Sequence, residues 1–209
     1  YISTNLIDKI LTSFNGKVIR TPTGFKWIAN EINHLKKNEL YINGFEEAIG
    51  ALPSTINRDK DSFQTAALIM EIIYEYHNKS MDLVDLLEKE IYPKYGHWYG
   101  ETTSILIQDL NWKEKALSIF EKLKSNDLDK ICNRDIISKK NNEEASAIEY
   151  YFDNDSWVKF RISGTEPKFK IYTNLYSKQD NFEYDTSYTK QLQIESFEIV
   201  EFMKKYLGL

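Results

Sequence analysis

The run RISGTEPKFK, which begins at Arg161, has the residue types of an anion-binding loop. Gly164 gives the backbone access to unusual angles, so that successive N–H groups can converge on one point. Ser163 and Thr165 add hydroxyl donors, and the planar guanidinium of Arg161 matches the oxygens of a phosphate group. Lys170 follows on a predicted strand and would add a second positive charge. The alternative is an ordinary polar turn, because turns of this composition are common.

Alternating strands must hold this loop in place. Residues 148–152 and 157–161 flank the turn DNDS, which is a hairpin signature, and residues 169–173 alternate again after the loop. A further strand is predicted at residues 102–107, and helical spacing predicts helices at 112–123 and 188–206. The polar stretch 139–144 has no periodicity and is expected to be an exposed loop. The C-terminal part is therefore predicted to be α+β, with an antiparallel sheet packed against two helices.

The first ninety or so residues alternate between helical and strand-like patterns. Helices are predicted at residues 6–14, 25–35, 63–74 and 82–91, with Asp61 as the N-cap of the third, and short strands at 17–20 and 40–42. This alternation is typical of parallel pairing through crossover helices, and therefore of an α/β fold. The best boundary lies at residues 93–96, so we divide the chain into an α/β domain (1–94) and an α+β domain (95–209).

Composition excludes several classes of function. The chain has 209 residues with 32 acidic and 27 basic side chains, a net charge of -5 that argues against a general nucleic-acid binder. No apolar stretch approaches the roughly 18 residues needed to cross a bilayer, so no membrane association is expected. The single cysteine, Cys132, cannot form an internal disulfide, and the three histidines are too dispersed to indicate a metal site. We expect a cytoplasmic protein.

Four stretches in one order resemble the α-D-phosphohexomutase superfamily, which contains the phosphoglucomutases and phosphomannomutases. The run at 161–170 resembles its phosphate-binding loop, and TGFK at 23–26 resembles its Thr-Gly-aromatic-Lys segment. GFEEAIG at 44–50 resembles the sugar-specificity loop, and RDKD at 58–61 the basic-acidic turn that follows it. The resemblance implies that phosphate is bound by Arg161, Ser163, Gly164, Thr165 and Lys170.

The resemblance also implies roles in binding the sugar. Glu46 occupies the position of a glutamate that accepts hydrogen bonds from sugar hydroxyls, and Glu47 is the neighbouring candidate. Lys26 matches a lysine that reaches the cleft, where its charge would offset that of phosphate. Ala48 stands where many members have serine, which leaves the choice between hexose and pentose open.

Two further cations follow the sugar loop. Arg58 and Lys60 either add positive potential near that loop or pair with Asp59 and Asp61. The sequence leaves these two interpretations open.

Members of this superfamily resemble one another in having four domains, and this chain corresponds to most of the third and the fourth. It contains neither a Thr-x-Ser-His-Asn-Pro run, which would carry the phosphoserine, nor an Asp-Gly-Asp-x-Asp-Arg run, which would bind Mg²⁺. No catalytic residue and no metal ligand is therefore expected here, and Mg²⁺ is expected only in the complete enzyme. The start at Tyr1 instead of Met indicates a piece of a longer protein.

The implied reaction of the complete enzyme interconverts sugar 1-phosphate and 6-phosphate through a phosphoserine and a bisphosphate intermediate. This chain would bind the phosphorylated sugar, would need the N-terminal domains as its partner, and would be inactive alone. One alternative is a stand-alone phosphosugar-binding module without catalysis. A second is a pentose-specific enzyme of the phosphopentomutase type.

Overall fold

A computed structural model of the chain describes residues 1–47, 50–143, 146–164, 166–178 and 187–209. Its largest element is a six-stranded sheet in the order β3-β8-β7-β6-β5-β4, in which every neighbouring pair is antiparallel. The strands are β3 (His97–Leu106), β4 (Lys130–Ile131), β5 (Arg134–Asn142), β6 (Ala147–Phe152), β7 (Trp157–Ile162) and β8 (Lys168–Ser177).

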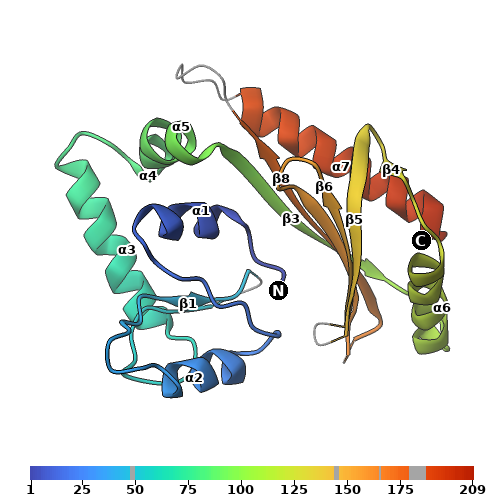
Figure 1. Cartoon of the computed structure of the whole chain (residues 1–209), viewed down its shortest axis with the longest axis horizontal. Coiled ribbons are helices and arrows are strands. Elements are labelled where there is room, and N and C mark those ends of the chain that lie inside the picture. Colours follow the sequence, from blue (N-terminus) through green and yellow to red (C-terminus); the bar gives the residue numbers. More distant parts are fainter. Residues whose placement is uncertain (48–49, 144–145, 165, 179–186) are drawn as a thin grey trace.

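Two helices, α6 (Trp112–Ser125) and α7 (Ser187–Leu207), cover one face of this sheet (Figure 1). Alternation along each strand explains the core beneath them, because successive side chains point to opposite faces. On β7, Val158 and Phe160 are fully buried against these helices, whereas Lys159 and Arg161 point to the other face. The core therefore leaves a polar face of the sheet toward the N-terminal part of the chain.

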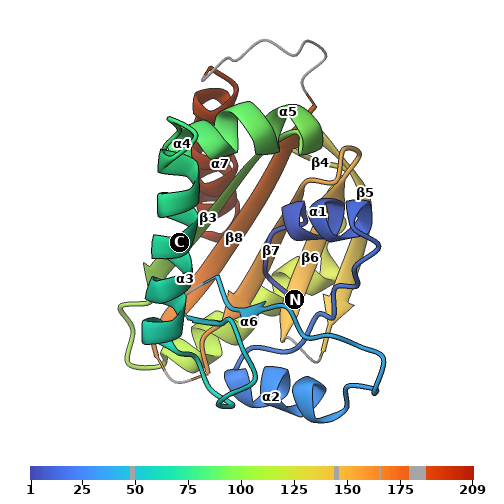
Figure 2. The same ribbon diagram turned by 90° about the vertical axis from the view of Figure 1, so that its left-hand side faces the viewer.

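The N-terminal part consists mainly of helices and lies against that polar face (Figure 2). Its small core is formed by Phe25, Ile28, Ile32 and Leu52. The elements are α1 (Leu6–Ser13), α2 (Phe25–Asn33), β1 (Gly44–Phe45), β2 (Ala51–Leu52), α3 (Ser62–His77), α4 (Leu83–Asp85), the π-helical turn η1 (Leu86–Ile91) and α5 (Tyr92–Tyr95).

Several predicted elements are present at their predicted places. The hairpin is β6–β7, and Asp155 in its turn has φ of 64°, a left-handed conformation that aspartate tolerates. Asp61 is the N-cap of α3, and its side chain accepts a hydrogen bond from the backbone N–H of Gln64. The division of the chain at residues 94 and 95 remains a prediction.

Four expectations were wrong. Residues 17–20 and 40–42 form no strand, and no strand pair among the described residues is parallel. Residues 139–142 are not a loop but the end of β5, because pairing with β6 satisfies the backbone while exposed strand positions accept polar side chains. The strand predicted to begin at residue 102 begins at His97.

Candidate functional site

The predicted phosphate loop connects β7 to β8, and its two cations are directly opposite each other. Arg161 and Lys170 are partners in the β7–β8 register, so their Cβ atoms lie about 5 Å apart on the same face of the sheet. Like charges directly opposite each other on one face of a sheet repel, and an anion bound between them would relieve the repulsion. The strands thus supply the two charges that a phosphate site needs.

The loop itself is closed by local hydrogen bonds. Ser163 donates its N–H to the carbonyl of Lys168 at 3.0 Å, and its hydroxyl accepts from the N–H of Glu166 at 3.2 Å. Gly164 has open space where a Cβ would be and does not adopt a positive φ, so the unusual backbone angle expected there is not found. Thr165, the remaining predicted loop residue, lies outside the described residues.

Arg161 is held by a residue from the N-terminal part. Its Nη1 donates to the hydroxyl oxygen of Thr23 at 3.1 Å, whereas its buried Nε has no hydrogen-bond partner among the described residues. Burial raises the pKa of the neighbouring Tyr172 phenol, although the charge of Arg161 acts in the opposite direction. The guanidinium is therefore positioned by Thr23 of the N-terminal part and by Tyr172 of β8.

Glu46 of the sugar-specificity loop contacts Gly24, the residue that follows Thr23. The backbone N–H of Gly24 donates to Glu46 Oε1, and Gly24 has φ of 119°, a conformation that side chains rarely adopt. Thr23 and Gly24 thus bring Arg161 of the phosphate loop and Glu46 of the sugar loop together. The sequence pattern indicates no role for Thr23 beyond its place in the TGFK motif, although its position beside Gly24 is a usable signal.

The other predicted sugar-binding residues have separate surroundings. Glu47 accepts a hydrogen bond from the backbone N–H of Thr4 at 2.8 Å. Lys26 is exposed, and its Nζ lies 5.0 Å from the centroid of the Trp27 ring. Within the described part of the chain, Lys26 makes no hydrogen bond or ion pair with Glu46.

The two cations of the basic-acidic turn have different partners. Arg58 donates to the side-chain oxygen of Asn33 at 3.0 Å and to the Thr55 carbonyl at 2.6 Å. Lys60 pairs with Asp59 at 3.4 Å. Arg58 thus binds neutral oxygens, and Lys60 has a carboxylate partner.

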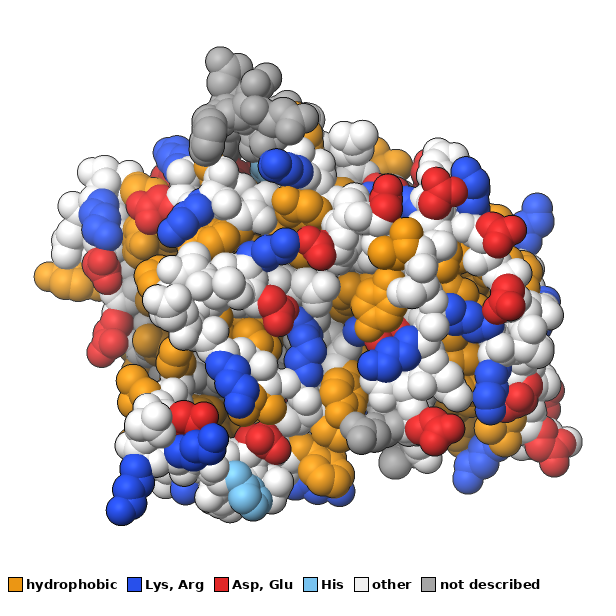
Figure 3. All heavy atoms as spheres, in the orientation of Figure 1, with side chains coloured by type: hydrophobic (Ala, Val, Ile, Leu, Met, Phe, Trp, Pro, Cys, Tyr) orange, Lys and Arg blue, Asp and Glu red, His pale blue; other side chains and the backbone are white. Residues whose placement is uncertain are grey.

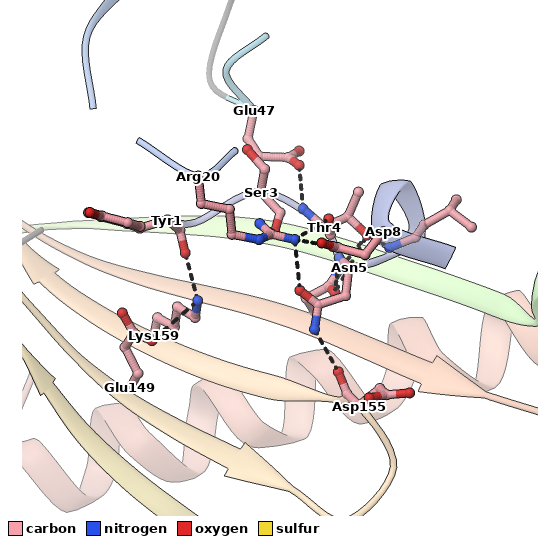
Figure 4. A network of polar contacts seen from close by, with 12 residues as sticks. Tyr1, Ser3, Thr4, Asn5, Asp8, Arg20, Glu47, Glu149, Asp155 and Lys159 are labelled. Atoms are coloured by element: carbon pink, nitrogen blue, oxygen red, sulfur yellow. Dashed lines mark hydrogen bonds and ion pairs between the residues drawn. The ribbon is translucent and has the colours of Figure 1, made fainter. Parts of the chain in front are cut away.

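A buried ion pair lies next to the phosphate loop on the same face of the sheet (Figure 4). Lys159 Nζ lies 3.4 Å from Glu149 Oε2, and the two side chains are 6% and 2% exposed. The Lys159 ammonium also donates to the Tyr1 carbonyl at 2.6 Å, and Glu149 accepts from Asn142 at 2.7 Å and from Tyr151. This pair therefore ties the N-terminal segment to the sheet.

Burial is the largest single influence on the pKa of each member of the pair. It lowers the pKa of Lys159 to about 8, even though Glu149 acts to raise that pKa. Burial acts to raise the pKa of Glu149, but the Tyr151 hydroxyl and the charge of Lys159 outweigh it and leave that pKa lowered. A cavity of about 540 Å³ is lined by both residues together with Arg20 and Lys140.

Further polar contacts hold the N-terminal segment on the sheet (Figure 4). Asn5 donates its backbone N–H to Asn174 at 3.3 Å, and Lys9 pairs with Asp155 at 2.7 Å. Arg20 donates to the Ser3 carbonyl at 2.9 Å. Sequence reasoning missed these residues, because their spacing carries no motif.

Neither a metal centre nor a membrane span is found among the described residues. No group of three or more His, Cys, Asp or Glu side chains there could hold a metal ion, so these residues do not fit Mg²⁺. None of the described helices is long and apolar enough to cross a bilayer.

With the fold and these loops in place, comparison with known proteins identifies the family. Residues 1–92 match the phosphoglucomutase/phosphomannomutase alpha/beta/alpha domain III. The chain belongs to the phosphohexomutase superfamily.

Three individual relatives are named as phosphomannomutases or as a phosphoglucomutase. A phosphomannomutase of Mycoplasmoides pirum is 48% identical over 181 residues, which is 87% of this chain and 33% of the relative. A phosphomannomutase of Mycoplasma pneumoniae is 37% identical over 100% of this chain and 36% of its own length, and a phosphoglucomutase of Staphylococcus epidermidis is 31% identical over 83% and 35%. The chain thus spans about a third of the length of these relatives.

The fold of the chain is also similar to that of a protein of known structure. The crystal structure of Paramecium pp63/parafusin, a phosphoglucomutase in its open form, matches with a TM-score of 0.60 at 19% identity. The match covers 99% of this chain and 37% of the parafusin chain. At this identity it concerns the fold alone.

Proposed function

We propose that this chain is the substrate- and phosphate-binding part of a phosphoglucomutase or phosphomannomutase. The complete enzyme would interconvert sugar 1-phosphate and 6-phosphate through a phosphoserine and a bisphosphate intermediate. The phosphoserine and the Mg²⁺ ligands would belong to the part of the longer protein outside this chain, and the chain alone would not turn over substrate. We place the protein in the cytoplasm, where its phosphorylated sugars are expected.

One observation carries this proposal, namely the junction at Thr23 and Gly24. Thr23 contacts Arg161, and Gly24 contacts Glu46. One short segment therefore orients both a residue that would bind phosphate and a residue that would bind the sugar. A guanidinium suits phosphate oxygens, and a fixed carboxylate suits adjacent hydroxyls. A phosphorylated sugar is the ligand that needs both groups at one place.

The same arrangement fits a ligand that binds in two orientations. In the proposed reaction the bisphosphate intermediate reorients within the site, so the loop must accept either of its phosphate groups. Arg161 and Lys170 recognise charge, and backbone N–H groups recognise oxygens, without regard to which end of the sugar carries the phosphate. Glu46 would accept hydrogen bonds from the ring hydroxyls in both orientations.

Titration of the chain with inorganic phosphate, glucose 1-phosphate, mannose 1-phosphate and ribose 1-phosphate, followed by amide NMR, tests the proposal. Phosphate alone is expected to shift the amides of Ser163, Gly164 and Lys170, and the preferred sugar phosphate is expected to shift those of Glu46 and Glu47 as well. Shifts at the phosphate loop with every ligand, but none at Glu46, would leave only a phosphate site.

Two charge-neutralising variants sharpen the test. Lys170→Gln and Arg161→Gln are each expected to weaken phosphate binding roughly tenfold, since each removes charge-assisted hydrogen bonds. Lys204→Gln, on α7 and therefore on the covered face of the sheet, makes the same change of charge and is expected to leave binding unchanged. Equal weakening by Lys204→Gln and Lys170→Gln would show that net charge alone explains the effect.

A further inference from the structure

Trp27 is an aromatic side chain that helix α2 leaves at the surface. It is 40% exposed, whereas Trp98 and Trp157 are 6% and 1% exposed and Trp112 is partly buried against the main core. The buried stripe of α2 consists of Phe25, Ile28 and Ile32, and Trp27 lies outside it. Hydrophobic side chains reach the surface between charged ones over the part of the molecule where α2 lies (Figure 1, Figure 3). Tryptophan is highly buried on average, so core packing does not account for this indole.

The indole lies beside the junction that orients the proposed phosphate-binding and sugar-binding residues. Trp27 donates its backbone N–H to the Gly24 carbonyl at 3.0 Å. A Cβ on Gly24 would lie 3.9 Å from Trp27 Cδ1, which is ordinary van der Waals contact. The N–H of the same Gly24 donates to Glu46 Oε1, and the preceding Thr23 accepts from Arg161. The indole, the carboxylate and the guanidinium are therefore gathered around two consecutive residues.

The indole face already has a positively charged neighbour. Lys26 Nζ lies 5.0 Å from the centroid of the Trp27 ring. An aromatic face carries partial negative charge, so it attracts an ammonium group. The hydrogen atoms on the carbons of a sugar ring carry partial positive charge and are attracted to an aromatic face for the same reason.

A phosphorylated pyranose offers one matching group for each side chain at this junction. Its phosphate oxygens suit Arg161, and its adjacent hydroxyls suit Glu46. Its C–H face is apolar and suits the indole of Trp27. Small-molecule sites commonly combine an aromatic wall with a few polar groups that fix orientation. Trp27 is thus placed to cover the part of the sugar that neither charged residue can bind.

We propose that Trp27 is a sugar-binding residue whose indole stacks on the C–H face of a hexopyranose phosphate, and that it favours this ring over the furanose ring of a pentose phosphate. A pyranose chair presents a broad face of axial hydrogens, whereas a furanose ring is smaller and puckered. The furanose therefore removes less apolar surface from water, and its stacking contributes less to binding. This inference rests on the proposed function, which assigns the sugar phosphate to the junction. It also supplies a choice between hexose and pentose that Ala48 leaves open.

Titration of the natural 209-residue chain and of Trp27→Ala with glucose 1-phosphate, ribose 1-phosphate and inorganic phosphate tests this. Affinities are read from the amide shifts of Ser163 and Lys170. Trp27→Ala is expected to weaken glucose 1-phosphate binding about tenfold, ribose 1-phosphate binding at most about threefold, and phosphate binding not at all. Trp27→Phe keeps an aromatic face and is expected to recover most of the affinity for glucose 1-phosphate.

Phe14→Ala is the matched control. Phe14 is 71% exposed at the end of α1, and Lys94 Nζ lies 5.5 Å from the centroid of its ring. The change therefore removes a similar exposed aromatic side chain with a similar lysine neighbour. It is expected to leave the binding of all three ligands unchanged. Equal weakening of glucose 1-phosphate binding by Phe14→Ala and Trp27→Ala would overturn the proposal.

Indole fluorescence provides a second measurement. Glucose 1-phosphate is expected to change the emission of the natural chain more than inorganic phosphate does, and this difference is expected to vanish in Trp27→Ala. The other three tryptophans remain in that variant and are buried or half-buried. A difference that persists in Trp27→Ala would show that the sugar acts on another tryptophan and would contradict the stacking.

The phosphate titration separates a failure of this inference from a failure of the proposed function. Glucose 1-phosphate that binds Trp27→Ala as tightly as the natural chain would refute the indole contact and leave the proposed function standing. Equal weakening of glucose 1-phosphate and ribose 1-phosphate would refute the preference for a pyranose. Equal weakening of inorganic phosphate would show that the change acts on the phosphate loop, which would also overturn the inference. If no ligand shifts the amides of Ser163 and Lys170 in the natural chain, the proposed function fails and the inference fails with it.

Discussion

The buried pair of Lys159 and Glu149 makes the stability of the chain depend on pH in a defined direction. Burial lowers the pKa of Lys159 to about 8 from its ordinary value of 10.5. Below pH 8 both the folded and the unfolded chain hold this proton. Between about pH 8 and 10.5 only the unfolded chain holds it, so the free energy of unfolding rises with pH. The cost of burying the charge is relieved as the lysine becomes neutral.

The size of this effect follows from the same values. At about 1.4 kcal/mol per proton and pH unit, the contribution of Lys159 to the free energy of unfolding rises by about 2 kcal/mol between pH 7 and 9.5. Measurement should stop near pH 9.5, because burial raises the pKa of Tyr41 and Tyr150 to about 12 and the opposite trend begins as unfolded tyrosines ionise.

Urea unfolding at pH 7, 8, 9 and 9.5 provides the assay, with the double variant Glu149→Gln and Lys159→Met as the reference. Replacing both partners is expected to change stability little at pH 7, because neither side chain leaves the other charged and unpaired. Subtracting the profile of the double variant removes the titration of the groups that do not interact with this pair. The single variant Lys159→Met is expected to lose about 3 kcal/mol, since it leaves Glu149 buried without its cation.

Parallel pH profiles for the natural chain and the double variant would show that Lys159 has an ordinary pKa. The close approach of the N-terminal segment to the sheet would then be wrong, because that contact excludes water from the ammonium. A fall in the stability of the natural chain relative to the variant would contradict the sign of the argument.

Three other variants have expected outcomes. Thr23→Val removes the acceptor for Arg161 and is expected to weaken phosphate binding by about five- to tenfold in calorimetry, with recovery in Thr23→Ser; equal weakening by both variants would contradict a role for the hydroxyl. Asp61→Ala removes the N-cap of α3 and is expected to cost about 1 kcal/mol in urea unfolding, whereas an unchanged midpoint would mean that the cap contributes nothing. Gly96→Ala is expected to lower the melting temperature by several degrees, because φ is 85° and the new Cβ would lie 2.2 Å from the Tyr176 ring. An unaltered melting curve would contradict the close contact between residue 96 and Tyr176.

Local patterns predicted the elements whose structure depends on their own residues. Alternation around the turn containing Asp155 predicted the β6–β7 hairpin, and Asp61 was recognised as a helix cap from its type and position. The candidate loops were found by their residue types, because charge, hydroxyl groups and glycine carry chemistry wherever they lie. The sequence alone also determined the family resemblance, through four motifs in one order.

Prediction failed where an element depends on a partner. Residues 17–20 and 40–42 have strand-forming side chains, but a strand exists only when another strand satisfies its backbone, and none of the described residues does so. Residues 139–142 illustrate the converse, because β6 makes a strand of a polar sequence that has no periodicity of its own. Backbone pairing is a property of two segments, and single-segment patterns cannot report it.

The sequence by itself determined which groups this chain offers to a ligand: two cations and hydroxyls in one loop, and carboxylates in another. Only the tertiary structure decided that Thr23 and Gly24 join these loops, and that Lys159 and Glu149 are buried together beside them. The reason is that Thr23 and Arg161 are 138 positions apart, so their contact depends on how the N-terminal part lies on the sheet. Chemistry is carried by residue type, whereas proximity is set by the packing of distant segments.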